Sequence, residues 1–516
     1  MRIVDFLDKG ASLGPDAPCL TTDGATLTYA DVRGLSFDVA AALVASGVEP
    51  GDKIAILSAN DPVAFGCVFG ISRAGAVWCP VNPRNEATEN RELLDLFDCS
   101  VLVFQASFAP LVARIRPDLP AIHTWVCLDG PVDGALSWDE FLARGDLPGR
   151  RDRAPAGDLA MIVGTGGTTG RPKGVMLTGT NLETMTALTL MGYPFDGRPV
   201  YLALAPLTHA AGVLCFPILC HGGEIVIMRG PDVGAFIRLV EAHGVTHTFL
   251  PPTLIYMVLG HEALDRTDLA SLQCFWYGAA PMSAARLAEA LRRIGPVMAQ
   301  LFGQTEAPMM ISMMPPADHF RPDGSVATER LSSAGRPAPL VTVAIMEPGG
   351  RLLDAGARGE IVVRSSLVTP GYYKNPAATA EASAHGWHHT GDIGYLDDDG
   401  YLFIVDRAKD MIITGGFNVY STEVEQAIMR HPEVQDCAVI GLPDDKWGER
   451  IEAVVQPFPG QHVEASALIA FVKERLGSVK TPKAVHVWPD LPRSKVGKIL
   501  KVDVKRTLTG SPPPAA

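Results

Sequence analysis

Short apolar runs alternate with longer helix-like segments between residues 50 and 305 of the chain. Runs such as Lys53–Leu57 and His247–Leu250 have the length and composition of buried strands. Strands separated by helices need crossover connections, which favour a largely parallel sheet. The alternation therefore predicts an α/β fold whose ligands bind in loops at the carboxyl ends of strands. The other expected strands are Ala76–Val81, Val101–Phe104, Leu159–Val163, Tyr201–Leu204, Glu224–Met228 and Leu272–Tyr277.

The character of the sequence changes twice after this region, as expected for a chain of 516 residues that is too long for one ordinary core. Residues 333–406 contain short β-runs and turns, which predict a small antiparallel or β-barrel-like subdomain. A unit from residue 407 to 516 follows, and Thr422 and Glu425 are spaced as a capping box for a helix that begins near Ser421. We expect a large N-terminal α/β domain (1–406) and a small, mobile α+β C-terminal domain (407–516).

Composition excludes several classes of protein. A net charge of −13 leaves no basic excess for binding nucleic acid. The nine cysteines are scattered without metal-ligand spacing, which is typical of reduced thiols. The N-terminus lacks the apolar region of a signal peptide, and no uncharged apolar run reaches the roughly 18 residues of a membrane span. These features predict a cytoplasmic protein without a transmembrane segment.

The loop Thr165–Gly174 (TGGTTGRPKG) follows an expected strand and has the chemistry of a phosphate site. Its glycines let consecutive backbone N–H groups converge on phosphate oxygens, while hydroxyls and one lysine add donors. It is not a Walker A loop, because no GK[ST] ends it. The alternative is a glycine-rich surface turn. The candidate phosphate-binding residues are Thr165, Gly166, Gly167, Thr168, Thr169, Gly170 and Lys173.

Several further motifs occur in a fixed order along nearly the whole chain. Together with this loop, they resemble those of the acyl-adenylate-forming (AMP-binding) superfamily, and most closely its bacterial fatty-acid and aryl-acid CoA ligases. The resemblance implies an ATP-dependent ligase that forms an acyl-adenylate and then an acyl-CoA. The motifs are APLTHAAG (205–212), YGAAPM (277–282), QLFGQTEA (300–307), TGD (390–392), DRAKDMIITGGFNVY (406–420) and PRSKVGKI (492–499).

The resemblance assigns catalytic roles to two of these motifs. Glu306, beside Thr305, matches the magnesium-binding glutamate, in keeping with the preference of Mg²⁺ for oxygen ligands. Lys498 matches the lysine that contacts both the acid and the α-phosphate, where cationic groups are needed because two anions meet. A solvated charge in a basic stretch is the alternative for Lys498.

The nucleotide site is implied by residues of three motifs. Asp392 matches the carboxylate that accepts both ribose hydroxyls, with Arg407 as a second contact; a helix or turn cap is the alternative for Asp392. Small residues on one side and an aromatic ring on the other would form a slot for adenine. The residues expected there are Gly278, Ala279, Ala280 and Phe302, with Gln300 at the base edge.

Lys409 falls at the hinge position of the family, which implies that the C-terminal domain rotates between the two half-reactions. This rotation would withdraw Lys498 and bring the Gly415–Gly416 hairpin to the site, where paired glycines leave a channel for the pantetheine arm of coenzyme A. Two positions depart from the family pattern. Gly166 replaces a serine, and Gly164 stands where an aromatic residue is common.

The expected acyl pocket is apolar, with walls at His209, Trp276, Tyr277 and Met309. The methionines of Pro308–Met314 could line it or belong to the core. We therefore expect a hydrophobic carboxylic acid, with a medium- or long-chain fatty acid first and an aryl or alicyclic acid second. The expected ligands are this acid, ATP, Mg²⁺ and coenzyme A. An acyl-AMP ligase that serves a carrier protein is the alternative, and the sequence leaves open whether the enzyme is a homodimer.

Overall fold

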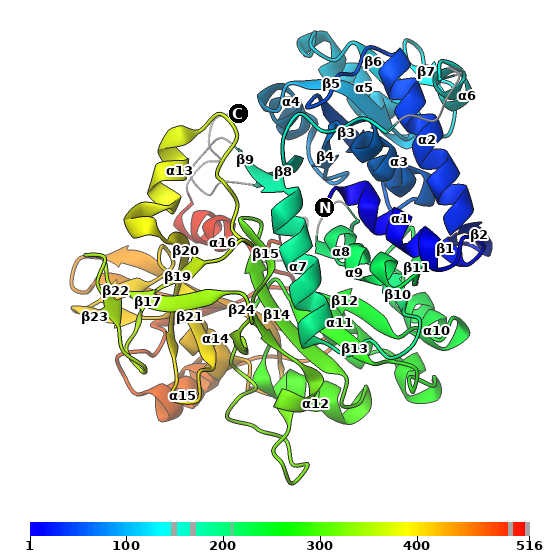
Figure 1. Cartoon of the computed structure of the whole chain (residues 1–516). Helices are drawn as coiled ribbons and strands as arrows, with labels where there is room; N and C mark the ends of the chain where they lie inside the picture. The colour runs from blue at the N-terminus through cyan, green and yellow to red at the C-terminus, as the bar shows by residue number, and fades with distance from the viewer. Residues whose placement is uncertain (146–151, 166–171, 208–209, 494–498, 511–516) are drawn as a thin grey trace.

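The computed structural model describes residues 1–145, 152–165, 172–207, 210–493 and 499–510. It contains four sheets that follow one another roughly in chain order (Figure 1). Two are large and mainly parallel, and two are smaller and mainly antiparallel. The mixed α/β fold with a small C-terminal unit agrees with the sequence prediction.

The first large sheet has seven strands in the order β7-β6-β5-β3-β4-β8-β9. Its central strands β3 and β4 are almost fully buried, which explains their near-continuous apolar sequence. Only the edge pair β8–β9 is antiparallel. The strands are β3 (Lys53–Leu57), β4 (Val77–Val81), β5 (Cys99–Phe104), β6 (Thr124–Cys127), β7 (Leu136–Ser137), β8 (Leu159–Thr165) and β9 (Lys173–Thr178).

The second large sheet has nine strands in the order β16-β15-β14-β13-β12-β10-β11-β1-β2. Its central strands β11, β10, β12, β13 and β14 are parallel, so their carboxyl ends share one edge. The strands are β1 (Pro18–Thr22), β2 (Ala25–Thr28), β10 (Val200–Ala203), β11 (Glu224–Ile227), β12 (His247–Leu250), β13 (Cys274–Gly278), β14 (Met298–Gln304), β15 (Ala307–Met314) and β16 (Arg336–Pro337).

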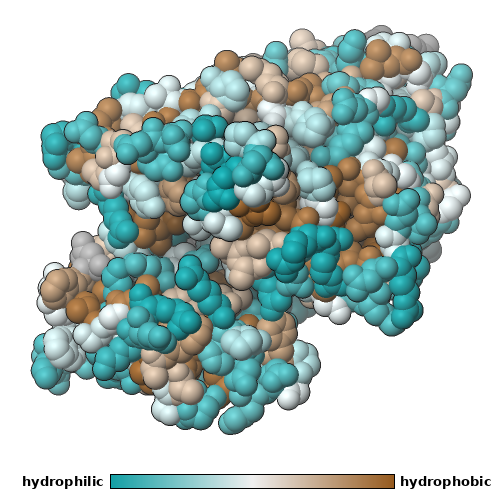
Figure 2. Space-filling model, turned by 90° about the horizontal axis from the view of Figure 1, so that it is seen from below, coloured by the Kyte–Doolittle hydropathy of each residue, from teal (hydrophilic) through white to brown (hydrophobic). Residues whose placement is uncertain are grey.

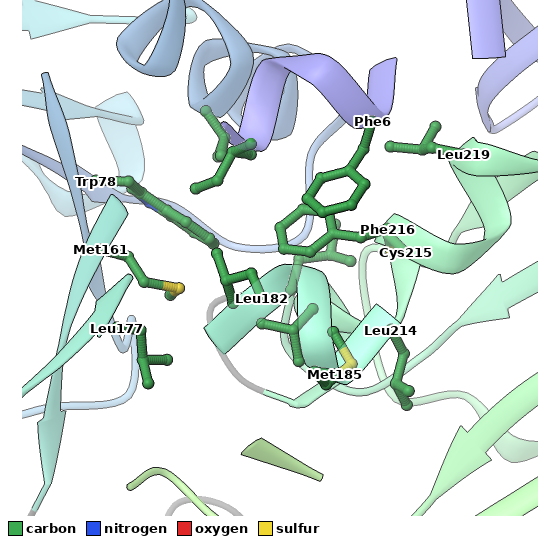
Figure 3. Close-up of a cluster of buried hydrophobic side chains, with 14 of the residues drawn as sticks. Phe6, Trp78, Met161, Leu177, Leu182, Met185, Leu214, Cys215, Phe216 and Leu219 are labelled. Atoms are coloured by element: carbon green, nitrogen blue, oxygen red, sulfur yellow. The ribbon is translucent and has the colours of Figure 1, made fainter. Parts of the chain in front are cut away.

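A shared hydrophobic core joins these two sheets (Figure 3). Helices α1 (Ile3–Leu13), α7 (Gly179–Gly192) and α9 (Cys215–Cys220) supply its centre. Phe6 of α1 stacks on Phe216 of α9, with ring centroids 4.9 Å apart. Trp78 of β4 and Met161 of β8 face them from the seven-stranded sheet in Figure 3. The core therefore fixes the phosphate-loop hairpin relative to the nine-stranded sheet.

The expected barrel-like subdomain is a five-stranded antiparallel sheet in the order β18-β17-β19-β20-β21. A turn precedes β21, where Gly400 has φ +77° and its N–H donates to the Asp397 carbonyl at 3.0 Å. The strands are β17 (Thr342–Met346), β18 (Leu352–Leu353), β19 (Gly359–Arg364), β20 (His388–Leu396) and β21 (Leu402–Arg407).

The C-terminal unit is built on the sheet β23-β22-β25-β24, with β26 beside β25. Helices α14 (Ser421–Ile428), α15 (Ala465–Leu476) and α16 (Lys501–Thr509) accompany it. The strands are β22 (Ile412–Thr414), β23 (Phe417–Val419), β24 (Val434–Asp444), β25 (Gly448–Pro457) and β26 (Ala484–Val487).

The predicted capping box of Thr422 and Glu425 is wrong. Helix α14 begins at Ser421, whose N–H donates to the Asp406 carboxylate at 2.5 Å, so a residue from β21 caps the helix. Glu425 instead accepts from the Val439 N–H at 2.8 Å. The box is absent because the N-cap is Tyr420, so Thr422 lies inside the first turn of the helix.

The C-terminal unit contacts the rest of the chain through several side chains. Arg286 of α12 (Ala284–Arg293) lies 4.7 Å from the Phe458 ring, and Arg358 lies 5.2 Å from the Tyr420 ring.

One face of the molecule is largely hydrophilic outside, and hydrophobic side chains gather in its recesses (Figure 2). Among the described residues, no helix is long and apolar enough to cross a membrane. All nine cysteines are free thiols.

Candidate active site

The two ends of the phosphate loop lie side by side in the β8–β9 hairpin. Thr165 pairs with Lys173, and the Thr165 hydroxyl donates to the Lys173 carbonyl at 3.4 Å. A Cβ at Gly164 would come within 2.7 Å of the Leu93 side chain on α4 (Ala87–Leu96), so a larger residue here would require Leu93 to move. The predicted loop residues Gly166, Gly167, Thr168, Thr169 and Gly170 lie outside the described residues.

Glu306 lies in the turn between β14 and β15, directly after Thr305. Its Oε1 accepts a hydrogen bond from the Tyr372 hydroxyl at 2.8 Å, and its carbonyl accepts one from the Thr369 N–H at 2.7 Å. The Lys173 ammonium lies 4.9 Å from the centre of the Tyr372 ring. Tyr372 therefore connects the predicted magnesium carboxylate to the lysine at the end of the phosphate loop.

Asp392 lies within β20 with only 3% of its surface exposed, so it does not cap a helix. Its Oδ1 pairs with Arg407 Nε of the neighbouring strand β21 at 2.7 Å, and its Oδ2 accepts from Gln304 Nε2 at 2.9 Å. Gln304 Nε2 also donates to the Thr390 carbonyl at 2.7 Å. His388 Nε2 lies 3.3 Å from Gln304 Oε1, and burial lowers the pKa of His388, which keeps its ring neutral. This network fixes the orientation of the Asp392 carboxylate.

The expected adenine slot lies where β13 and β14 end beside each other, with Gly278 opposite Leu301. A Cβ at Gly278 would strike the Leu301 carbonyl, so the strands themselves require this glycine. Ala279 is exposed and has φ +65°. Such backbone strain in a residue other than glycine occurs preferentially at ligand sites. Ala280, Gln300 and Phe302 are each half-buried at this edge, where a ligand could reach them.

The predicted acyl pocket is corrected at Tyr277. Trp276 and Tyr277 are consecutive residues of β13, so they point to opposite faces of the sheet. Trp276 is buried among the rings of the core that joins the two sheets. Tyr277 belongs to the core on the other face, where its hydroxyl hydrogen-bonds with His319 Nε2 at 2.9 Å. The two side chains therefore do not line one pocket together.

The methionine run divides into core and accessible positions. Met310, Met313 and Met314 are buried, whereas Met309 is half-buried and has φ +63°. Its strained backbone lies directly against Gly303, at a register shift between β14 and β15. Met309 is thus the only residue of the run that keeps the expected position for a pocket wall, while His209 lies outside the described residues.

The expected hinge and coenzyme A hairpin lie at the start of the C-terminal unit. Lys409 is exposed and follows β21. Gly415 and Gly416 form the turn between β22 and β23 with φ +57° and +80°. A side chain at Gly415 would lie 3.0 Å from the Trp447 ring. The glycine is therefore needed both for the turn and for the space beside this ring.

Lys498 lies outside the described residues, but both flanks of its segment are fixed. Arg493 and Ile499 form an antiparallel bridge. The Arg493 guanidinium donates to Asp436 Oδ2 at 2.8 Å within the C-terminal unit and to Thr253 Oγ1 at 3.4 Å across the boundary. Thr253 lies in the first turn of α11 (Pro252–Leu259), just after β12. The base of this segment therefore contacts the strand-end edge of the large sheet.

Three residues of this site were missed from the sequence. Gln304 stands in the same motif as Glu306, so its position was the available signal. His388 adjoins the TGD motif but has no residue type specific to nucleotide binding. Tyr372 is followed by Tyr373, and nothing in the local sequence distinguishes the two.

Comparison with known proteins places this site in a family. The model of the AMP-binding enzyme family matches residues 7–373, and that of the AMP-binding enzyme C-terminal domain matches residues 423–498. A feruloyl-CoA synthase from Amycolatopsis sp is 36% identical over 504 residues, covering 96% of this chain and 97% of that protein. The medium/long-chain-fatty-acid–CoA ligase FadD8 from Mycobacterium tuberculosis is 39% identical over 479 residues, covering 89% and 81%.

A solved structure supports the same family assignment. The amide bond synthetase McbA from Marinactinospora thermotolerans has a TM-score of 0.89 with this chain at 31% identity, covering 98% of this chain and 99% of that one. The predicted enzyme class, an AMP-forming acid–thiol ligase, is confirmed. The chain belongs to the family of AMP-binding enzymes.

Proposed function

We propose that this enzyme activates a hydrophobic carboxylic acid as its acyl-adenylate and transfers the acyl group to coenzyme A. In the first step, a carboxylate oxygen bonds to the α-phosphorus of ATP, the bond from this phosphorus to the oxygen that bridges to the β-phosphorus breaks, and pyrophosphate leaves. In the second step, the sulfur of coenzyme A bonds to the acyl carbon and its thiol proton passes to solvent. The bond from the acyl carbon to the phosphate oxygen breaks, and AMP leaves.

One observation carries this proposal: the Gln304–Glu306 turn contacts both predicted halves of a nucleotide site. Gln304 holds the Asp392 carboxylate, and Glu306 is held by Tyr372 beside Lys173. Asp392 on one side of the turn and Glu306 with Lys173 on the other suit an extended ligand with a ribose at one end and phosphates at the other. Because the acid and ATP are both anionic, Lys173 and the predicted Lys498 would stabilise the charge that develops as they meet.

Glu306 fits a magnesium ion. Its carboxylate offers the oxygen ligand that Mg²⁺ prefers, and no hydrogen bond or ion pair from the described residues occupies its Oε2. When bound, Mg²⁺ would neutralise charge on the phosphate oxygens.

The Gly415–Gly416 hairpin supports coenzyme A as the acceptor. Phe417 and Trp447 are exposed beside it, with 59% and 41% of their surfaces accessible. The ammonium groups of Lys446 and Lys483 lie 4.8 and 5.8 Å from the Trp447 ring. Exposed rings next to cations suit a ligand that combines a flat base with phosphates.

The acid is proposed to be apolar, with a medium- or long-chain fatty acid first and an aryl or alicyclic acid second. Met309, half-buried against the hydrophobic core, offers an apolar contact. The relatives, one acting on feruloyl and one on fatty acyl groups, support both classes. A panel of these acids with ATP, Mg²⁺ and coenzyme A distinguishes them by pyrophosphate release and thioester formation.

Lys498→Ala tests the division between the steps. We expect it to abolish pyrophosphate release and to leave thioester formation from supplied acyl-AMP largely intact, whereas Lys495→Ala, in the same segment, should affect neither step. Loss of both steps in Lys498→Ala would contradict its assigned role. If acyl-AMP forms but coenzyme A is never consumed, the acceptor is another group, such as a carrier protein, and the second half of the proposal fails.

A further inference from the structure

We infer that Tyr372 is a positioning residue that prepares Glu306 for the magnesium ion of Mg·ATP while keeping Glu306 apart from Lys173. The inference rests on the proposed function, because it assigns a role within the same nucleotide site.

The segment from Thr369 to Tyr373 is held on two sides. On one side it pairs with β9: the Met176 N–H donates to the Gly371 carbonyl at 3.1 Å, and the Tyr373 N–H donates to the Gly174 carbonyl at 2.8 Å. On the other side, the Thr369 N–H donates to the Glu306 carbonyl. The segment thus spans the distance between the phosphate-loop hairpin and the Glu306 turn, with Tyr372 fixed at its centre.

The Tyr372 hydroxyl is a donor to Glu306. An ionised carboxylate can only accept, and the 2.8 Å contact therefore holds Oε1 of Glu306 in one orientation. Its Oε2 is left for a ligand, since it forms no hydrogen bond or ion pair with a described residue.

The Tyr372 ring contacts the second charged group, the Lys173 ammonium. Lys173 lies over this ring at 4.9 Å, in the range of a cation–π contact. No ion pair within the described part of the chain involves Lys173. A direct pair between Lys173 and Glu306 would leave each charge satisfied by the other. Tyr372 stands between the two, so the ammonium stays available for phosphate and the carboxylate for metal.

The chain supplies a matched control in the next residue. The Tyr373 hydroxyl donates to Asp98 Oδ2 at 2.8 Å, on the surface and away from Glu306. Tyr372→Phe and Tyr373→Phe each remove one hydroxyl that bonds a carboxylate, and both keep the ring. The phenylalanine at 372 also keeps the contact with Lys173, so only the interaction with Glu306 changes.

The experiment measures ATP binding by isothermal titration calorimetry without acid or coenzyme A, once with Mg²⁺ and once with EDTA. We expect Tyr372→Phe to weaken binding roughly tenfold with Mg²⁺, which corresponds to about 1.4 kcal/mol, and to leave binding in EDTA unchanged. Tyr373→Phe should bind like the wild type under both conditions.

Two results would overturn the inference: unchanged binding with Mg²⁺, or equal weakening with Mg²⁺ and EDTA. In a Glu306→Gln background, Tyr372→Phe should have little further effect, because the residue through which it acts is altered; a further tenfold loss there would also contradict the inference. Wild-type protein that fails to bind Mg·ATP at all would instead refute the proposed function, so the two failures are distinguishable.

Discussion

Gln304 donates a hydrogen bond to the carboxylate of Asp392, which is expected to bind ribose. One amide nitrogen donates both to Asp392 Oδ2 and to the Thr390 carbonyl, while His388 fixes the amide from the other side. The buried carboxylate would lose a donor in Gln304→Leu, and hydrogen bonds to charged groups contribute about 1.5–3 kcal/mol. We expect the KM for ATP to rise roughly tenfold or more with little change in kcat.

Steady-state kinetics with varied ATP would check this prediction. Gln273→Leu is the control, since Gln273 bonds to the backbone of Asp196 away from the site. A fall in kcat with an unchanged KM would show that Gln304 acts on the chemical step and not on nucleotide binding.

Two buried histidines make stability depend on pH. Burial lowers the pKa of His247 and of His319 from 6.5 to about 4. Between pH 6.5 and 4 the unfolded chain binds more protons than the folded one, so stability is complete above 6.5 and falls as the pH approaches 4. Each histidine should lower the free energy of unfolding by roughly 2 kcal/mol between pH 7 and pH 5.

Urea unfolding at these two pH values measures the effect. In His319→Gln the pH-dependent loss should shrink by the contribution of one histidine, even if the variant is less stable at pH 7. An unchanged pH dependence would mean that His319 is already protonated in the folded protein.

The roles of Lys173, Glu306 and Asp392 stay predictions, but these candidate residues could be named because a motif specifies their chemistry. The strained backbone at the site was not predictable from the sequence. The positive φ of Ala279 follows from the close approach of β13 and β14, and that of Met309 from the register shift beside Gly303. Both depend on strand pairing between distant segments, which a local pattern does not encode.

At the scale of elements, the expected strands are present, but they divide between two sheets. Runs such as Lys53–Leu57 and His247–Leu250 form β3 and β12 with the expected bounds. The first belongs to the seven-stranded sheet and the second to the nine-stranded one. The N-terminal hairpin β1–β2 joins the nine-stranded sheet beside β11, far along the chain. Alternation predicts crossover connections, but it does not say which strands become neighbours.

Helices α14 and α16 are joined by a half-buried ion pair. Lys501 Nζ lies 2.7 Å from Glu425 Oε1 and donates to Ser421 Oγ at 2.5 Å. Removing one partner of such a pair leaves the other group unsatisfied, which costs about 1–3 kcal/mol. We therefore expect Lys501→Met to destabilise the C-terminal unit strongly, as measured by urea unfolding and by proteolysis after residue 407.

An exposed pair on the same chain is the control. Arg351 and Glu347 form an i,i+4 contact on the surface, so Arg351→Met should change stability by less than about 1 kcal/mol. Adding Glu425→Gln to Lys501→Met should restore part of the loss, since it removes the unpaired charge. No restoration would mean that Lys501 stabilises the unit by packing and not through its charge.

For the whole molecule, the order of the parts was predictable, but the contacts across the hinge were not. The boundary at residues 406 and 407 stays a prediction, as does rotation about Lys409. Sequence motifs name the hinge, whereas the contacts of Arg286, Arg358 and Arg493 across the boundary depend on how two folded units meet. The sequence pattern within either unit does not predict these contacts.

Asp406 lies before the predicted hinge and caps helix α14, which follows it. Its carboxylate accepts from the N–H of Ser421 at 2.5 Å and from the Ser421 hydroxyl at 2.8 Å, with 4% of its surface exposed. Rotation of the C-terminal unit about Lys409 would carry Ser421 away from Asp406. The contact therefore favours the present arrangement, in which Arg493 holds the base of the Lys498 segment against Thr253.

Because Lys498 is assigned to adenylation, Asp406→Ala should slow pyrophosphate release more than thioester formation from supplied acyl-AMP, by roughly tenfold if the lost contact is worth about 1.4 kcal/mol. Asp398→Ala, at an exposed position in the turn before β21, is the control and should leave the ratio of the two rates unchanged. Equal slowing of both half-reactions in Asp406→Ala would indicate general destabilisation. A slower thioester step alone would place the present arrangement in the second half-reaction, because the contact would then favour transfer to coenzyme A.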